Sequence, residues 1–174
     1  MQERNKLERF EESIVPHLAA AYNLARWLTR GDRDAEDVVQ EAYLRAFRFF
    51  GGFRGGDGRA WLLTIVRNTC YTWLQQNRSR EFLALDDEMQ QVESDEPSPE
   101  ASLIVSADSK LLARALEELP VEFREAIVLR ELEGLSYKEI ADLADIPLGT
   151  VMSRLARARK RLQQSIARLM ALEA

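Results

Sequence analysis

The amino-acid sequence predicts an all-α protein with two small helical domains, which are joined by a flexible acidic linker. Apolar residues recur at helical spacing along most of the chain, and no stretch shows the alternation expected of a β-strand. Residues 81–100 interrupt this pattern, because they carry eight acidic and no basic side chains and because Pro97 and Pro99 oppose helix. We therefore expect a first domain over residues 1–80, a linker over residues 81–101 and a second domain over residues 102–174. The alternative is a solvated loop within one domain, although loops of this length are uncommon.

The first domain begins with two helices whose apolar stripes face the predicted core. The first helix ends at Gly31, and its stripe consists of Phe10, Ile14, Leu18, Ala21, Ala25 and Leu28. Asp34 caps the second helix, which runs to about Phe50 and buries Val38, Val39, Ala42, Tyr43, Ala46 and Phe47. The outer side of the second helix carries Asp37, Gln40, Glu41, Leu44 and Arg48. Because Leu44 is apolar on an otherwise polar side, we expect this side to contact a partner.

A glycine-rich loop and a long helix complete the first domain. Residues 51–58 hold five of the eight glycines, so another backbone or a base can approach this loop closely. The helix over residues 59–80 has a packing stripe formed by Trp61, Leu62, Ile65, Thr69 and Trp73. A second stripe is formed by Thr64, Arg67, Asn68, Tyr71, Gln75 and Arg78. Its aromatic, cationic and hydrogen-bonding groups suit single-stranded nucleic acid, although they are also consistent with a solvated helix face.

The second domain is predicted to contain two helices followed by a helix-turn-helix. The first helix spans residues 103–119, and the next begins at Pro120, ends at Gly134 and points Phe123, Ile127 and Leu132 inward. Ser136 and Glu139 then form a capping box, in which each side chain satisfies a free backbone N–H of the other residue. Leu135 and Ile140 occupy the two staple positions around this cap. The chain breaks at residues 144–147, and a last helix begins at about Leu148.

The last helix has an apolar side and a cationic side, as a DNA-reading helix requires. Val151, Leu155, Ala158 and Leu162 recur at helical spacing and are expected to pack inward. The opposite side carries Thr150, Ser153, Arg154, Arg157 and Arg161. Residues 148–168 contain six basic residues and no acidic one. A solvated basic face is the alternative, but the caps, the turn length and the one-sided charge together favour DNA binding.

Composition argues against several other classes of protein. The net charge is −5, yet the last 39 residues, 136–174, carry seven basic and four acidic side chains, so local charge still permits DNA binding. His17 and Cys70 are the only histidine and cysteine, which leaves no cluster of zinc ligands. No phosphate-binding loop or nucleophile–base pair is visible, so we expect no metal, no cofactor and no enzymatic activity. The absence of a signal peptide, of a membrane span and of paired cysteines predicts a cytoplasmic protein.

Three segments, in their order along the chain, resemble segments of the extracytoplasmic-function (ECF) sigma factors of bacteria. The resemblance covers nearly the full length of the chain. Residues 34–50, DAEDVVQEAYLRAFRFF, are similar to the segment that docks on the clamp coiled coil of RNA polymerase. Residues 53–74, FRGGDGRAWLLTIVRNTCYTWL, are similar to the segment that melts and reads the minus-ten element. Residues 119–162 are similar to the domain that reads the minus-thirty-five element. One departure is Asp145, which stands where the family often has glycine; aspartate tolerates the left-handed conformation better than most residues.

The resemblance implies partners and site residues. The partners are core RNA polymerase, promoter DNA and an anti-sigma protein that holds the factor inactive. Core polymerase would be bound by Asp37, Gln40, Glu41, Leu44 and Arg48. The minus-ten element would be bound by Phe53, Arg54, Arg59, Arg67, Asn68 and Tyr71. The minus-thirty-five element would be bound by Thr150, Ser153, Arg154, Arg157, Lys160 and Arg161.

Two other functions remain open at the level of sequence. A stand-alone helix-turn-helix regulator would account for residues 136–162 but would leave the glycine-rich loop and the polar stripe without a role. A sigma mimic that sequesters an anti-sigma protein would not need a basic recognition face, whereas Arg154, Arg157 and Arg161 are present.

Overall fold

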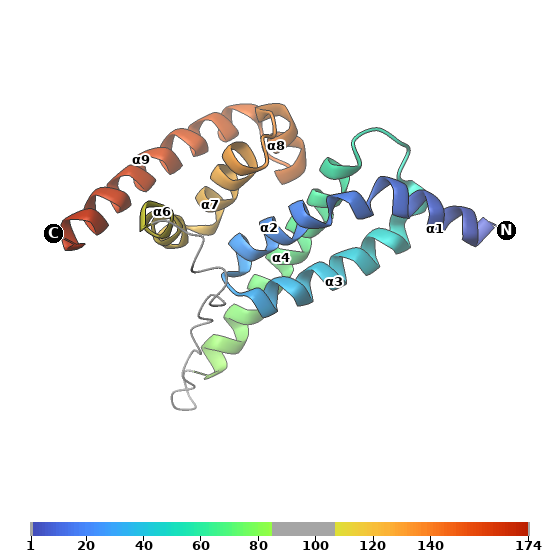
Figure 1. The fold of residues 1–174 in the computed structure, drawn as a ribbon, viewed down its shortest axis with the longest axis horizontal. Helices are drawn as coiled ribbons and strands as arrows, with labels where there is room; N and C mark the ends of the chain where they lie inside the picture. Colours follow the sequence, from blue (N-terminus) through green and yellow to red (C-terminus); the bar gives the residue numbers. More distant parts are fainter. Residues whose placement is uncertain (1, 85–106, 174) are drawn as a thin grey trace. The chain divides into compact units, whose positions relative to one another are not determined.

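The computed structural model describes residues 2–84 and 107–173, and for residues 79–84 it describes the backbone alone. The chain divides into two compact units, residues 1–92 and 93–174, and every regular element in the described ranges is a helix (Figure 1). The predicted all-α class with two helical domains is therefore confirmed. Most of the predicted linker lies outside the described residues. Its first four residues, 81–84, are described, and they continue the last helix of the first unit, which ends at Ala84.

The first unit is built on three helices that each contact the other two, α2 (Leu18–Thr29), α3 (Asp32–Phe49) and α4 (Gly58–Ala84). They are preceded by α1 (Gln2–Ser13) and the 3₁₀ turn η1 (Val15–His17). A second 3₁₀ turn, η2 (Phe50–Gly52), leads from α3 into the glycine-rich loop. The centre of the unit is apolar, and its fully buried side chains include Ile14, Leu24, Leu28, Val38, Leu62 and Leu63.

The first predicted helix is in fact two helices. Pro16 lies in η1, where its missing N–H and fixed φ favour a break between α1 and α2. As a result Leu18, which was expected on the buried stripe, is 47% exposed at the start of α2. Phe47 of α3 is also exposed rather than buried, although its ring lies 5.3 Å from that of Phe10.

The junction between α2 and α3 also differs from the prediction. Arg30, not Gly31, adopts the left-handed conformation that ends α2, with φ of 68°, and its N–H donates to the carbonyl of Arg26. Gly31 is instead the extended N-cap of α3, so Asp34 lies within the first turn and is not the cap. The reason is tertiary: Asp32 accepts hydrogen bonds from Arg26 Nε at 2.6 Å and from the Tyr22 hydroxyl at 3.2 Å, which fixes the start of α3 on α2.

The second unit consists of α6 (Ala107–Glu118), α7 (Val121–Ile127), the π-helix η3 (Val128–Leu132), α8 (Tyr137–Ala144) and α9 (Leu148–Glu173). Helices α6, α7 and α8 all pack on α9. Residues 103–106 of the predicted first helix lie outside the described residues. Leu132 is 51% exposed rather than inward, because the wider π turn rotates the end of the helix relative to a regular α-helix.

A buried arginine joins the first two helices of this unit. Arg124 is 2% exposed, and its Nη1 donates to the carbonyls of Leu119 at 2.9 Å and Glu117 at 3.3 Å. These carbonyls belong to the end of α6 and the residue after it, where helical partners are lacking. Arg124 thus fixes the angle at which α6 meets α7, although its sequence position in an acidic helix gave no sign of burial.

Candidate promoter- and polymerase-binding surfaces

The helix-turn-helix forms at the predicted residues. Ser136 Oγ accepts the Glu139 N–H at 3.1 Å, and Glu139 Oε1 accepts the Ser136 N–H at 3.0 Å, which confirms the capping box. The staple residues Leu135 and Ile140 are both buried. At the turn, Asp145 adopts the left-handed conformation with φ of 56°, and its N–H donates to the Ala141 carbonyl. Aspartate therefore fills the position that commonly needs glycine.

Helix α9 has the predicted apolar side and a more complex polar side. Val151, Leu155 and Ala158 are buried, and Leu162 is half-buried. The exposed residues of the predicted DNA face are Ser153, Arg157, Lys160 and Arg161, whereas Thr150 and Arg154 are half-buried. Arg154 lines a small hollow together with Glu122 and Glu125 of α7. It therefore lies on the flank of α9 beside two carboxylates, not on the outermost side.

Several of the cations on α9 interact within the unit. Arg159 pairs with Glu131 at 2.9 Å, and this hydrogen bond raises the pKa of the Arg159 guanidinium. Arg168 pairs with Glu118 of α6, and the hydrogen bond lowers the pKa of that carboxyl. The Arg161 guanidinium lies over the ring of Phe123, 5.5 Å from its centroid. The exposed cations of α9 thus include Arg157 and Lys160 and, in addition, three that contact other helices of the unit, Arg159, Arg161 and Arg168.

The outer side of α3 is exposed as the sequence predicted. Asp37, Gln40, Glu41 and Arg48 are all exposed, and Leu44 is 70% exposed in their midst. The Glu41 carboxylate pairs with Arg45 Nη2 at 2.8 Å, one turn further along the helix. A large apolar side chain exposed to this degree among charged neighbours is typical of a contact surface.

The glycine-rich loop is anchored at both ends. At its start, the ring of Phe53 lies 5.5 Å from that of Phe50 and 5.2 Å from that of Trp61, so Phe53 is buried in an aromatic cluster. At its end, Asp57 Oδ1 accepts the backbone N–H groups of residues 59 and 60, at 3.0 and 3.2 Å, as an N-cap.

Between these anchors the loop has an exposed tip and a close backbone contact. Gly55 and Gly56 adopt φ of +88° and +90°, a conformation that L-residues rarely take, and Arg54 beside them is exposed. Gly58 lies so close to the end of α1 that a Cβ atom there would be 2.4 Å from the Ser13 carbonyl oxygen. Only glycine fits this contact without movement of the backbone.

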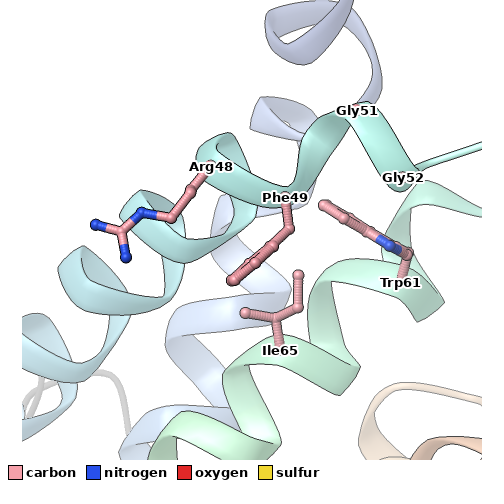
Figure 2. Close-up of a pocket in the computed structure, with 6 residues that line it drawn as sticks. All are labelled: Arg48, Phe49, Gly51, Gly52, Trp61 and Ile65. Atoms are coloured by element: carbon pink, nitrogen blue, oxygen red, sulfur yellow. The ribbon is translucent and has the colours of Figure 1, made fainter.

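An open hollow of about 520 Å³ lies between the end of α3, the loop and the start of α4. It is lined by Arg48, Phe49, Gly51, Gly52, Trp61 and Ile65. Figure 2 shows the side chains of Phe49, Trp61 and Ile65 converging, whereas the Arg48 guanidinium points away from them. Trp61 and Ile65, which are predicted on the packing stripe of α4, line an open, largely apolar depression that helical periodicity does not reveal.

The polar stripe of α4 continues from this hollow. Asn68 is seven residues, or about two helical turns, beyond Trp61, so it lies on the same side of the helix. Asn68 is exposed, and its Oδ1 lies 3.4 Å from Arg67 Nη1. The Arg67 guanidinium is stacked over the ring of Tyr71, 4.0 Å from its centroid. The predicted residues 67, 68 and 71 are thus brought together, and Arg59 is half-buried at the start of the helix.

Among residues 2–84 and 107–173, no helix is both long and apolar enough to cross a membrane. In the same ranges, His, Cys, Asp and Glu side chains nowhere gather in a group of three or more that could hold a metal ion.

Family models and known proteins match both units. Sigma-70 region 2 matches residues 14–80, and Sigma-70 region 4 matches residues 109–162, so the fold is that of a sigma factor of the sigma-70 class. The ECF RNA polymerase sigma-E factor of Haemophilus influenzae is 37% identical over 155 residues, which cover 84% of this chain and 81% of that protein. The chain belongs to the family of ECF RNA polymerase sigma factors.

Other relatives agree with this assignment. The ECF sigma factor SigE of Mycolicibacterium smegmatis is 35% identical over 162 residues, which are 91% of this chain but 62% of that protein's length. Among solved structures, the sigma factor RpoE in complex with the anti-sigma factor NepR, from Bartonella quintana, is similar with a TM-score of 0.77 and 31% identity. That match covers 92% of this chain and 98% of RpoE.

Proposed function

We propose that this chain binds core RNA polymerase, recognises and melts specific promoters, and initiates transcription under the control of an anti-sigma protein. The observation that carries the proposal is the presence, in one chain, of a unit that matches sigma region 2 and a unit that matches sigma region 4. A stand-alone regulator needs only the helix-turn-helix, whereas a promoter-melting factor also needs a surface for single-stranded DNA. We propose domain boundaries at residues 1–80 for the first domain, 81–101 for the linker and 102–174 for the second domain.

The outer side of α3 is the proposed surface for core polymerase. Leu44 supplies exposed apolar area, which gains free energy when a partner covers it. The polar and charged residues around it, Asp37, Gln40, Glu41 and Arg48, would orient the partner and limit its choice.

The glycine-rich loop and the polar side of α4 are the proposed minus-ten site. An extruded base requires a preformed pocket, because unstacking costs a few kcal/mol that contacts in the pocket must return. The anchored loop, the hollow beside Trp61 and the exposed amide of Asn68 meet these needs, since an amide can both donate and accept hydrogen bonds. The Arg67–Tyr71 stack would supply a flat cationic surface for bases and phosphates. Arg54 and Arg59 would add cations at the loop and at the start of α4, and the buried Phe53 would act by holding the loop in place.

The outer side of α9 is the proposed minus-thirty-five site. Ser153 and Arg157 would enter the major groove, while Lys160 and Arg161 would lie nearer to phosphates. Arg154 and Thr150 would contact DNA from the flank, and Arg154 would have to leave the vicinity of Glu122 and Glu125 to reach a base.

We further propose that the chain acts in the cytoplasm and has no enzymatic activity of its own. The sigma factor RpoE of Bartonella quintana is bound to an anti-sigma factor in its solved complex, and we extend this mode of control to the present chain. Inhibition would require the anti-sigma protein to cover at least one of the surfaces described above.

Transcription with purified core polymerase tests the proposal. The full chain, core enzyme and a library of candidate promoter fragments should together yield transcripts, and omission of the chain should abolish them. Footprints on single-stranded bases should appear around the minus-ten element only with all components present. Tight binding of the chain alone to a palindromic site, without transcription, would instead support an ordinary helix-turn-helix regulator.

A further inference from the structure

The first two turns of the recognition helix expose two large apolar side chains. Leu148 is 50% exposed and Met152 is 55% exposed, and they are one turn apart on α9. Met152 lies off the inward stripe, whereas Leu148 precedes the buried Leu155 by seven residues and so lies at the exposed start of that stripe. Met152 therefore presents an apolar side chain to solvent on the first turns of α9, as Leu44 does on α3.

The helical positions of these residues direct Met152 away from the core. Each residue advances about 100° around an α-helix, so the side opposite Val151, Leu155 and Ala158 contains Gly149, Ala156 and their neighbours. Ser153 lies close to this outward line, whereas Met152 lies about 90° from it on one flank of the helix, and both are exposed. Nothing lies within 4 Å of the Cβ position of Gly149, so a bulky partner can approach the backbone of the first turn closely.

The surroundings of Met152 favour DNA as the partner. Residues 148–168 contain six basic and no acidic side chains, which suits a polyanion. In a helix-turn-helix, the N-terminal residues of the second helix are those that contact base edges. In the major groove, thymine alone presents a methyl group, and apolar side chains read it by direct contact.

We propose that Met152, supported by Leu148, contacts the 5-methyl group of a thymine in the minus-thirty-five element and is a specificity-determining residue. This inference rests on the proposed function of α9 as the minus-thirty-five reader. The flexible, polarizable thioether of Met152 can adapt to the methyl group, while Ser153 near the outermost line of α9 and Arg157 on the flank beyond it read hydrogen-bonding groups. Met152 thus supplies the apolar part of a readout that the basic residues do not provide.

Removal of the methyl group from the DNA tests the contact directly. Holoenzyme assembled from the full chain and core polymerase first selects promoters from a library randomised over the minus-thirty-five region. Each selected thymine is then replaced in turn by deoxyuridine, which keeps the hydrogen-bonding edge and lacks only the methyl group. Holoenzyme binding is measured for the wild-type chain, for Met152→Ala, and for Met170→Ala as a control, since Met170 is 57% exposed near the other end of α9.

We expect deoxyuridine at one position to weaken wild-type binding about fourfold, which corresponds to about 0.8 kcal/mol for one buried methyl-sized group. With Met152→Ala, the same DNA change should have almost no effect, whereas with Met170→Ala it should retain its wild-type effect. If the selected element has no thymine, or if Met152→Ala is as sensitive to deoxyuridine as the wild type, the inference is wrong. If Met152→Ala weakened binding to the thymine DNA and to the deoxyuridine DNA by the same factor relative to the wild-type chain, Met152 would contact a protein partner and the inference would also be overturned. Failure of the wild-type holoenzyme to select any promoter would instead contradict the proposed function.

Discussion

Replacing Gly58 with alanine tests how firmly the glycine-rich loop is anchored to the first unit. The added Cβ would lie 2.4 Å from the Ser13 carbonyl oxygen, whereas ordinary contacts begin at 3.4 Å. The backbone of either α4 or the end of α1 must therefore move by about 1 Å, and because the opposing atom belongs to the backbone, no side-chain rotation can relieve the clash.

The size of the effect follows from two opposing contributions. Overpacking in a tight interior costs about 1–3 kcal/mol. The exchange of glycine for alanine in a helix returns about 0.5–1 kcal/mol, less at a first turn than in the interior. We therefore expect Gly58→Ala to lower the free energy of unfolding of the first unit by about 1–2 kcal/mol. Gly51→Ala is the matched control, because Gly51 has nothing within 4 Å and a φ that L-residues accept, and its effect should stay within about 0.5 kcal/mol.

Tryptophan fluorescence isolates the relevant unit, since Trp27, Trp61 and Trp73 all belong to the first unit. In urea, with a slope of about 1 kcal/mol per molar, the midpoint for Gly58→Ala should fall by about 1–2 M. Promoter melting should fall as well, because the displaced loop borders the hollow beside Trp61. If Gly58→Ala and Gly51→Ala unfold at the same urea concentration, the close contact with Ser13 does not anchor the loop.

Three further predictions concern the proposed binding surfaces. Joint replacement of Gln40 and Leu44 by lysine should abolish co-purification with core polymerase while circular dichroism stays unchanged, because both side chains are exposed on α3; retained co-purification would remove the surface assignment. Asn68→Ala should reduce melting of a duplex promoter and relax base choice at the minus-ten element without weakening core binding, and unchanged permanganate footprints would place the pocket elsewhere. Arg157→Ala should alter base preference at one or two minus-thirty-five positions, by about 1–3 kcal/mol, whereas Lys160→Ala should weaken all sequences alike and lower the salt dependence. Equal losses on every sequence for both variants would contradict a base contact by Arg157.

Features that depend on short-range chemistry could be predicted from the sequence alone. The capping box of Ser136 and Glu139 joins residues three apart, so its hydrogen bonds need nothing from the rest of the chain. The left-handed turn at Asp145 and the exposure of Leu44 follow in the same way from local conformation and helical periodicity. The all-α class follows from the same periodicity repeated along both units.

The tertiary structure decided which parts of each polar face are covered by neighbouring elements. Periodicity assigns residues to one side of a helix, but it does not say how far the next helix extends around that side. Arg154 shares the polar side of α9 with Arg157, yet Glu122 and Glu125 of α7 border the hollow that it lines, whereas Arg157 is exposed. Met152 could have been noticed by the criterion applied to Leu44, an apolar residue outside the inward stripe, but the extent of its exposure depends on the packing of α9.

Contacts between different helices of the unit decided the remaining features. The need for glycine at position 58 arises from the Ser13 carbonyl oxygen, 45 residues earlier in the chain. The end of α2 at Arg30 depends on the position of Asp32 against Arg26 and Tyr22, which a scan for glycine and aspartate caps does not reveal. Sequence therefore determined the helices and their polar sides, because these depend on neighbours three or four residues away. Tertiary packing decided which of those side chains remain available to polymerase and DNA, because only the assembled helices define what is covered.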